Sequence, residues 1–172
     1  MDDLPRLIVV TGPPGAGKTT IATALQARLG LPLIAKDALK ETLGGALGIE
    51  GRARSEELGP AVFDLLGLVV RELLEHGVSV IAEGNFRERS TLFSGLPRAE
   101  IVQVHVTATP ETLRARLRGR NNRHPVHYDR EAADEVSARA ARGEWPPLAI
   151  GGRLIEIDTT VWPELDEVLA TV

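Results

Sequence analysis

Short apolar runs alternate with longer amphipathic stretches along this chain. Short runs rich in Val, Ile and Leu, bounded by Gly, Pro or polar residues, are typical of buried strands. Such runs predict five β-strands, at residues 7–10, 31–36, 78–84, 101–106 and 153–158. Between these runs, apolar residues recur every three or four positions, as they do in amphipathic helices. Strands that alternate with helices imply an α/β fold in which helices cover both faces of a parallel sheet.

Capping residues and glycines set the predicted helix boundaries. Asp37 is predicted as the N-cap of a helix after the second strand, and Thr109 as the N-cap of a helix with Pro110 at its first position. Residues 44–57 are polar and glycine-rich, which predicts a mobile loop. The remaining helices are predicted at residues 21–29, 57–76, 131–141 and 164–169 and directly after Phe86.

The stretch TGPPGAGKTT, residues 11–20, directly follows the first predicted strand and fits the phosphate-binding pattern G-x-x-x-x-G-K-[ST]. Glycines let the backbone turn its N–H groups toward phosphate oxygens, and the next helix offers the positive end of its dipole. Lys18 would then reach the β- and γ-phosphates, and the Thr19 hydroxyl would hold Mg²⁺. The nucleotide-binding residues predicted here are Gly12, Pro13, Pro14, Gly15, Ala16, Gly17, Lys18, Thr19 and Thr20.

Polar residues stand at the ends of the predicted strands, and ligands bind at this edge of a parallel sheet. Asp37, after the second strand, could accept the proton of an attacking hydroxyl, bind substrate or hold Mg²⁺ through water, although helix capping alone would also explain it. Glu83, which ends the third strand, could bind substrate or orient Mg²⁺ through water, or be tied structurally to backbone N–H groups. Asn85 is a further substrate-binding candidate, and Thr159, after the fifth strand, a nucleotide-binding one.

Arginines are concentrated in one segment, LRARLRGRNNRHPVHYDR, residues 113–130. Gly119 and the following asparagines indicate that the helix frays into a flap, which we place at residues 118–132. Phosphoryl transfer depends on positioning and charge stabilisation, so guanidinium groups on such a flap suit that reaction. Part of the cluster would also serve as an ordinary solvated helix surface.

Composition restricts the remaining possibilities. The chain has 172 residues, of which 43% are hydrophobic, so we expect one domain spanning residues 1–172. Its net charge of −4 gives no global positive field for a long polyanion, and any anion site must be local. Cysteine is absent, which excludes disulfides, thiolate metal sites and cysteine nucleophiles. No run predicts a signal peptide or membrane span, so a cytoplasmic protein is expected.

These motifs resemble those of the P-loop kinases of the nucleoside-monophosphate-kinase-like group, in particular the kinases with an AAA-type ATP-binding domain. The resemblance rests on GPPGAGKTT at 12–20, AKDALKETL at 35–43, EGNF at 83–86 and ETLRARLRGR at 111–120. It implies a three-layer P-loop NTPase fold, with a five-stranded parallel sheet of order 2-3-1-4-5 and a small arginine-rich lid. It further implies that ATP, with Mg²⁺, donates its γ-phosphate to a hydroxyl.

The resemblance also implies roles for single residues. Asp37 corresponds to the catalytic base, Arg116 to the arginine beside adenine, and Arg120 and Arg123 to lid arginines that approach the phosphates. The resemblance also implies that Lys18 is a catalytic residue. The chain departs from the family pattern at two places. Glu83 stands where aspartate is commoner in the family, and Lys36–Asp37 stands where sugar and shikimate kinases have a pair of acidic residues.

The predicted function is that of an ATP-dependent kinase for a hydroxyl of a small molecule, such as a sugar, nucleoside or antibiotic-like compound. Residues 44–57 and the segment around Asn85 are expected to form the acceptor pocket. A polynucleotide 5′-hydroxyl kinase is an alternative, disfavoured by the net charge and by only two Trp, one Tyr and three Phe for base stacking. A second alternative function is that of a nucleotide-binding switch or weak ATPase that acts through a partner. ATP is favoured over GTP because no N-K-x-D motif occurs, and either a monomer or a homodimer is compatible with the sequence.

Overall fold

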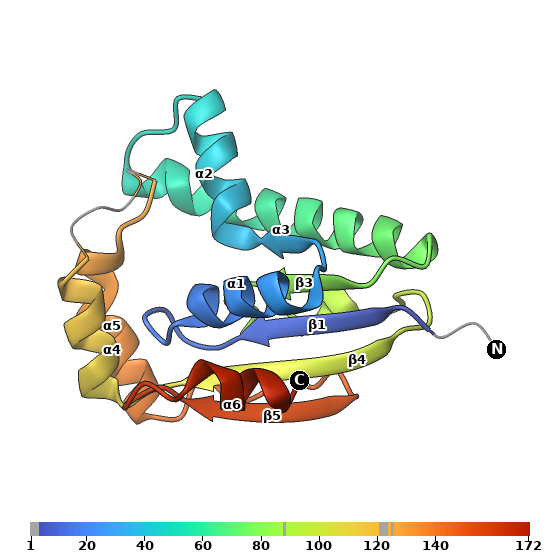
Figure 1. Ribbon diagram of the computed structural model, residues 1–172. Coiled ribbons are helices and arrows are strands. Elements are labelled where there is room, and N and C mark those ends of the chain that lie inside the picture. The colour runs from blue at the N-terminus through green and yellow to red at the C-terminus, as the bar shows by residue number, and fades with distance from the viewer. Residues whose placement is uncertain (1–3, 88, 121–123, 125) are drawn as a thin grey trace.

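Five parallel strands form the sheet in a computed structural model that describes residues 4–87, 89–120, 124 and 126–172 (Figure 1). The order is β2-β3-β1-β4-β5, which confirms the predicted α/β fold and strand order. Registered pairs such as Val10 with Glu83 and Val104 with Ile155 hold neighbouring strands in parallel. The strands are β1 (Arg6–Thr11), β2 (Leu33–Ala35), β3 (Val80–Glu83), β4 (Glu100–Thr107) and β5 (Arg153–Asp158).

Helices lie on both faces of this sheet. Side chains from α1, α4, α5 and α6 share one hydrophobic core with the sheet, and side chains from α3 and η1 share the other. The described α-helices are α1 (Lys18–Leu29), α2 (Lys36–Ala46), α3 (Arg52–Glu75), α4 (Pro110–Arg118), α5 (Asp129–Ala141) and α6 (Leu165–Ala170), and η1 (Ser90–Phe93) is a 3₁₀ turn. None of the described helices is long and apolar enough to cross a membrane.

The central strand β1 supplies residues to both cores by simple alternation. Ile8 and Val10 belong to one core, whereas Leu7 and Val9 belong to the other, and all four are fully buried. Each such side chain stabilises the fold by about 1.5–3 kcal/mol relative to exposure. This burial anchors the loop that follows β1, because the chain enters the loop directly from the best-packed part of the sheet.

Three predicted boundaries around α2 and α3 are wrong. Helix α2 begins at Lys36 with Ala35 as its N-cap, so Asp37 is not the cap but lies in the first turn, where the helix dipole still favours a carboxylate. The predicted strand 31–36 is too long, because β2 covers only Leu33–Ala35. Residues 44–57 are mostly helical rather than a loop, because α2 continues to Ala46 and α3 already begins at Arg52.

Gly44 lies in α2 at the point where Val126 packs against this helix. A Cβ at Gly44 would lie 2.9 Å from a methyl group of Val126, so the helix needs glycine where the segment after α4 rests against it. Elsewhere the capping prediction is confirmed, since the Thr109 hydroxyl accepts from the Thr112 N–H and Pro110 begins α4. The helix predicted after Phe86 is only the short turn η1.

Figure 1 shows how these elements surround the carboxyl end of the sheet. Helix α2 and the start of α3 project on one side, the paired helices α4 and α5 lie on another, and the loop between β1 and α1 lies between them. The elements that carry the predicted site residues therefore meet at this end of the sheet.

Candidate functional site

The loop between β1 and α1 has the backbone geometry that the phosphate-binding pattern requires. Gly12, Gly15 and Gly17 have φ angles of 141°, 86° and 89°, in the region that favours glycine. Gly17 is the N-cap of α1, so the unpaired N–H groups of the first helical turn face the loop. This loop is suited to bind an anion through its backbone.

Gly12 is predicted to be irreplaceable for stability. A Cβ at this position would lie 1.9 Å from the carbonyl oxygen of Val106, at a backbone conformation that L-residues rarely adopt. Gly12→Ala is therefore expected to lower the free energy of unfolding by about 3–5 kcal/mol, measured by urea denaturation. Gly48→Ala is the control, because its φ of 59° is also positive but no atom lies within 4 Å, and we expect a loss of about 1 kcal/mol. Equal losses in both variants would contradict the steric argument.

Lys18 is the first residue of α1 and folds back over the loop. Its Nζ atom donates to the carbonyl oxygen of Pro13 at 2.9 Å, which holds the ammonium group in front of the loop. Burial lowers the pKa of Lys18 below the usual range of a lysine. The negative charges of Glu83 and Asp37 oppose this shift, and the positive charge of Arg120 adds to it. These predicted residues therefore share one electrostatic environment.

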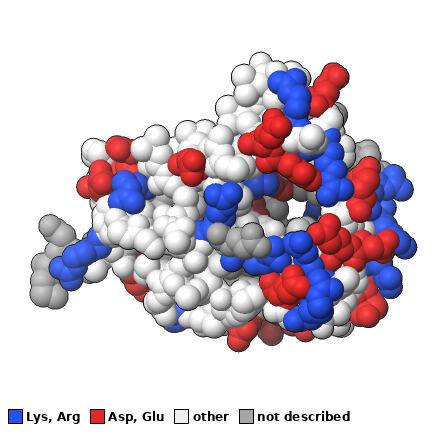
Figure 2. Space-filling view, turned by 180° about the vertical axis from the view of Figure 1, so that it is seen from behind, with Lys and Arg blue, Asp and Glu red and all other residues white. Residues whose placement is uncertain are grey.

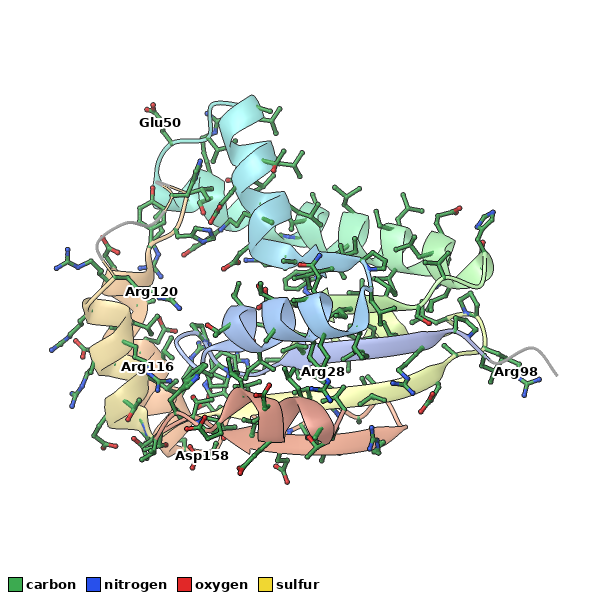
Figure 3. The ribbon with its side chains drawn as sticks, in the orientation of Figure 1. Arg28, Glu50, Arg98, Arg116, Arg120 and Asp158 are labelled. Atoms are coloured by element: carbon green, nitrogen blue, oxygen red, sulfur yellow. The ribbon has the colours of Figure 1, made fainter. Side chains whose placement is uncertain are left out.

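Arg116 and Thr159 support the loop from the side of β5. Arg116 donates from Nη1 to the Gly15 carbonyl at 3.3 Å and to the Thr159 hydroxyl oxygen at 2.9 Å. Thr159 is fully buried, with its hydroxyl oxygen 2.8 Å from the Ala16 carbonyl oxygen. In Figure 3, Arg116 and Arg120 both lie on the α4 side of the site, with Arg120 above Arg116 in this view. Direct contacts of Arg116 and Thr159 with a nucleotide stay predictions.

Trp162 completes this side of the loop, and sequence reasoning did not find it. A Cβ at Gly17 would lie 2.6 Å from the Trp162 ring, so the indole packs directly on the loop backbone. The Arg116 guanidinium lies 5.7 Å from the ring centroid, within reach of a cation–π contact. The tryptophan remains 41% exposed, although it packs against both groups. No sequence spacing links it to the loop, because the contact depends on where the segment after β5 returns.

A cavity of about 450 Å³ opens in front of the loop. Its walls come from the loop, from α2 and α3, from the end of β3 and from the segment that joins α4 to α5. Figure 2 shows lysine, arginine, aspartate and glutamate side chains of both signs gathered around a hollow in this part of the surface. The cavity is therefore strongly polar.

Most predicted site residues line this one cavity. Among them are Asp37, Glu83, Asn85 and Arg120, which come from three different parts of the chain. Glu83 is 4% exposed and therefore buried as a carboxylate at the end of β3. From the phosphate loop itself, the lining includes Pro14, Gly15, Gly17, Lys18, Thr19 and Thr20. Arg123, the second predicted lid arginine, lies outside the described residues.

Two lysines of α2 also line the cavity and were not predicted as site residues. Lys36 donates from Nζ to the Asp37 carboxylate at 3.1 Å, so the predicted base is held by a direct ion pair. Lys40 is 9% exposed, which is unusual for a lysine. Their spacing of four residues places both on one helix face, and this was the signal available in the sequence.

The described part of the predicted lid rests on α2 and α3. His127 Nε2 lies 2.9 Å from a carboxylate oxygen of Glu41, and the buried Ser55 hydroxyl donates to the Val126 carbonyl at 2.6 Å. These contacts join the segment between α4 and α5 to the opposite wall of the cavity. His127 and Tyr128 consequently become part of the lining.

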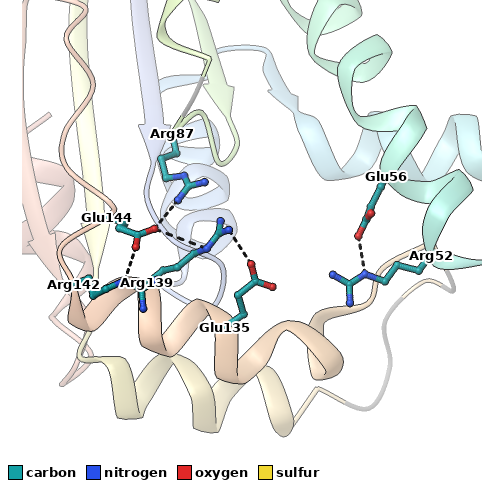
Figure 4. A network of polar contacts seen from close by, with 7 residues as sticks. All are labelled: Arg52, Glu56, Arg87, Glu135, Arg139, Arg142 and Glu144. Carbon is teal, nitrogen blue, oxygen red and sulfur yellow. Dashed lines mark hydrogen bonds and ion pairs between the residues drawn. The ribbon is translucent and has the colours of Figure 1, made fainter.

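An arginine–glutamate network fixes the far end of α5 to the segment after β3 (Figure 4). Glu144 accepts from Arg142 Nε at 2.6 Å and from Arg87 Nη1 at 3.2 Å, and it lies 3.8 Å from Arg139 Nε. The hydrogen bond from Arg142 lowers the pKa of Glu144 below its usual range, and the nearby positive charges act in the same direction. Because Arg87 closely follows Asn85, the network restrains that wall of the cavity.

The sequence pattern of the family described as AAA domain matches residues 7–142 of this chain. A cytidylate kinase from Archaeoglobus fulgidus is 27% identical over 118 residues, which cover 67% of this chain and 62% of that protein. The chain thus spans less than two thirds of the length of this curated relative.

Solved structures match almost the whole chain. The crystal structure of a candidate kinase from Chloroflexus aurantiacus is 34% identical, covers 98% of this chain and 97% of its own, and has a TM-score of 0.86. A sugar kinase from Janibacter sp. HTCC2649 is 20% identical and covers 97% of this chain and 91% of its own, with a TM-score of 0.65. The second likeness concerns the fold alone.

Proposed function

This chain belongs to the AAA domain family and has the fold of the P-loop kinases, and on that premise we propose that it transfers the γ-phosphate of ATP to a hydroxyl group of a small molecule. The observation that carries the proposal is the shared cavity. A lysine at the phosphate loop and two carboxylates, Asp37 and Glu83, line the same space of about 450 Å³. A phosphate donor and a hydroxyl acceptor can therefore meet beside a group able to take a proton.

ATP and Mg²⁺ fit the residues present. Three glycines with positive φ and the start of α1 offer backbone donors for phosphate oxygens, and Lys18 adds a positive charge. Thr19 is exposed at the start of α1, where its hydroxyl can hold Mg²⁺, with Asp37 or Glu83 contributing through water. The ion supplies charge neutralisation at the phosphates.

The remaining residues are proposed to take four different roles. Arg120 lies close enough to Lys18 to affect its pKa, which supports a role in stabilising charge on the transferred phosphoryl group. Arg116 and Thr159 contact the loop through its carbonyl groups, and we propose that they border the site for the base of the nucleotide. Asp37 is the proposed base, and Glu83 and Asn85 are proposed to bind the acceptor.

A screen of hydroxyl compounds with γ-labelled ATP tests the proposal. We expect label transfer to at least one sugar, nucleoside, or aminoglycoside or phenicol antibiotic. Transfer to a 5′-hydroxyl oligonucleotide alone would instead favour a polynucleotide kinase, in which case binding should weaken steeply as salt rises. ATP binding with slow hydrolysis, and no transfer to any compound, would favour the nucleotide switch and contradict the kinase proposal.

A further inference from the structure

The wall of the cavity formed by α2, α3 and the end of β3 carries information about the acceptor. We call it the acceptor half and define it by its charged residues on α2, α3 and β3, which are Lys36, Asp37, Lys40, Arg52, Glu56 and Glu83. Lys18 and Arg120 are not included, because they lie on the side where the phosphates are expected. The inference below rests on the proposed phosphotransfer.

The acceptor half contains three cations and three anions. Two of the cations form direct ion pairs within it, Lys36 with Asp37 at 3.1 Å and Arg52 with Glu56 at 2.6 Å. The remaining two charges of the acceptor half, Lys40 and Glu83, are both buried and opposite in sign. The positive charges of this wall are therefore balanced by negative charges that line the same space.

This balance disfavours an anionic acceptor. A carboxylate or phosphate entering the cavity loses hydration and needs an excess of positive charge to compensate. The acceptor half has no such excess. His127 does not change this result, because its ring is paired with Glu41, which offsets the positive charge of a protonated ring.

The lining also disfavours an aromatic acceptor. Among the described lining residues, those with mainly apolar side chains are Pro14, Ala132 and Tyr128. A nucleobase is normally held between aromatic or apolar faces, and among the described lining residues only Tyr128 and His127, whose ring is paired with Glu41, carry an aromatic ring. The three phenylalanines of the chain are not part of the lining.

One buried oxygen in this wall lacks a donor. The Asn85 Oδ1 atom is inaccessible to solvent and has no hydrogen-bond partner among the described residues. A buried acceptor atom left in this state costs about 1–3 kcal/mol. The ammonium and carboxylate groups that line the cavity can donate to hydroxyl groups of a ligand and accept from them.

We infer that the phosphate acceptor is a small, uncharged, non-aromatic polyol, such as an unmodified sugar or a cyclitol. Several hydroxyls can donate to the carboxylates while accepting from the lysines, without adding net charge to the acceptor half. The acceptor must also be small, since the cavity of about 450 Å³ has to admit the end of a triphosphate as well.

Matched acceptors with γ-labelled ATP test this inference. The panel pairs neutral hexoses, alditols and cyclitols with sugar acids and sugar phosphates of the same carbon skeleton, and adds nucleosides as an aromatic class. For at least one neutral polyol, we expect kcat/KM to exceed that of each matched anion and of every nucleoside by about tenfold or more, a difference of about 1.4 kcal/mol. A higher kcat/KM for an anion or nucleoside would overturn the inference but leave the phosphotransfer proposal standing. Transfer to no compound, with ATP still bound, would overturn both.

A charge change in the acceptor half gives an independent readout. Glu56→Gln removes one anion and releases Arg52 from its ion pair at the cavity wall (Figure 4). The ratio of kcat/KM for a sugar acid to that for its neutral partner should rise several-fold in this variant. Glu75→Gln, an exposed residue at the other end of α3, is the matched control and should leave the ratio as it is. An equal ratio in both variants would contradict the charge-balance argument.

Discussion

Lys18→Ala is expected to abolish measurable phosphotransfer and to weaken ATP binding by about 10²-fold. The ammonium group is held in front of the loop by its contact with the Pro13 carbonyl, at the position where the pattern places the β- and γ-phosphates. A hydrogen bond between charged partners contributes about 1.5–3 kcal/mol, and removal of a donor to a developing negative charge costs about 10²–10³-fold in kcat. Both losses are expected to combine in kcat/KM.

Equilibrium titration with labelled ATP and single-turnover transfer would separate the two effects. Arg28→Ala is the matched control, because Arg28 is an exposed cation in the last turn of the same helix (Figure 3). We expect the control to bind ATP like the unaltered protein. Full turnover by Lys18→Ala would show that the loop does not hold the phosphates as proposed.

The lowered pKa of Lys18 adds a pH dependence with a definite sign. Because burial disfavours the charged form, the folded protein releases this proton at a lower pH than an exposed lysine would. In the interval between the folded and unfolded pKa values, the unfolded chain binds more protons, so stability without nucleotide rises with pH. ATP affinity should fall over the same interval, since the neutral amine no longer attracts phosphate.

Local patterns predicted the alternation of strands and helices and the tight turn between β1 and α1. Five apolar runs joined by helices predicted the parallel sheet, whereas the strand order was implied by the family resemblance. The loop is encoded in consecutive residues. The glycines at 12, 15 and 17 have the positive φ angles that the pattern implies. In each case the relevant interactions are formed by residues close together in the sequence or by a simple periodicity.

Contacts between distant segments were not predictable in this way. His127 and Glu41 are 86 positions apart, and the contact of Trp162 with Gly17 depends on the path of the chain after β5. Gly44 is a similar case, because it is helical despite the low helix propensity of glycine and lies where Val126, from the segment after α4, packs against α2. Packing between distant segments thus determines both the contacts of the predicted lid and the shape of the acceptor half.

Asp37→Asn is expected to lower the rate of phosphotransfer by about 10²–10⁴-fold while ATP binding is largely kept. Asp37 lines the cavity opposite the phosphate loop and is held by Lys36, so its carboxylate is placed to take a proton from an acceptor hydroxyl. The amide of Asn has nearly the same shape but cannot act as a base. Asp64→Asn, which replaces an exposed carboxylate on α3, is the control and should keep its full rate.

The shape of the pH profile distinguishes the two chemical roles open to Asp37. If the carboxylate is the base, the acidic limb of the rate profile reports its protonation and disappears in Asp37→Asn. If it acts by holding Mg²⁺ through water, the variant should instead recover much of its rate at high Mg²⁺ concentration. We expect the first result, because the Lys36 ion pair at 3.1 Å already provides the carboxylate with one positive charge. An unchanged rate at all Mg²⁺ concentrations would remove Asp37 from the mechanism and leave Glu83 as the remaining carboxylate in the cavity next to the loop.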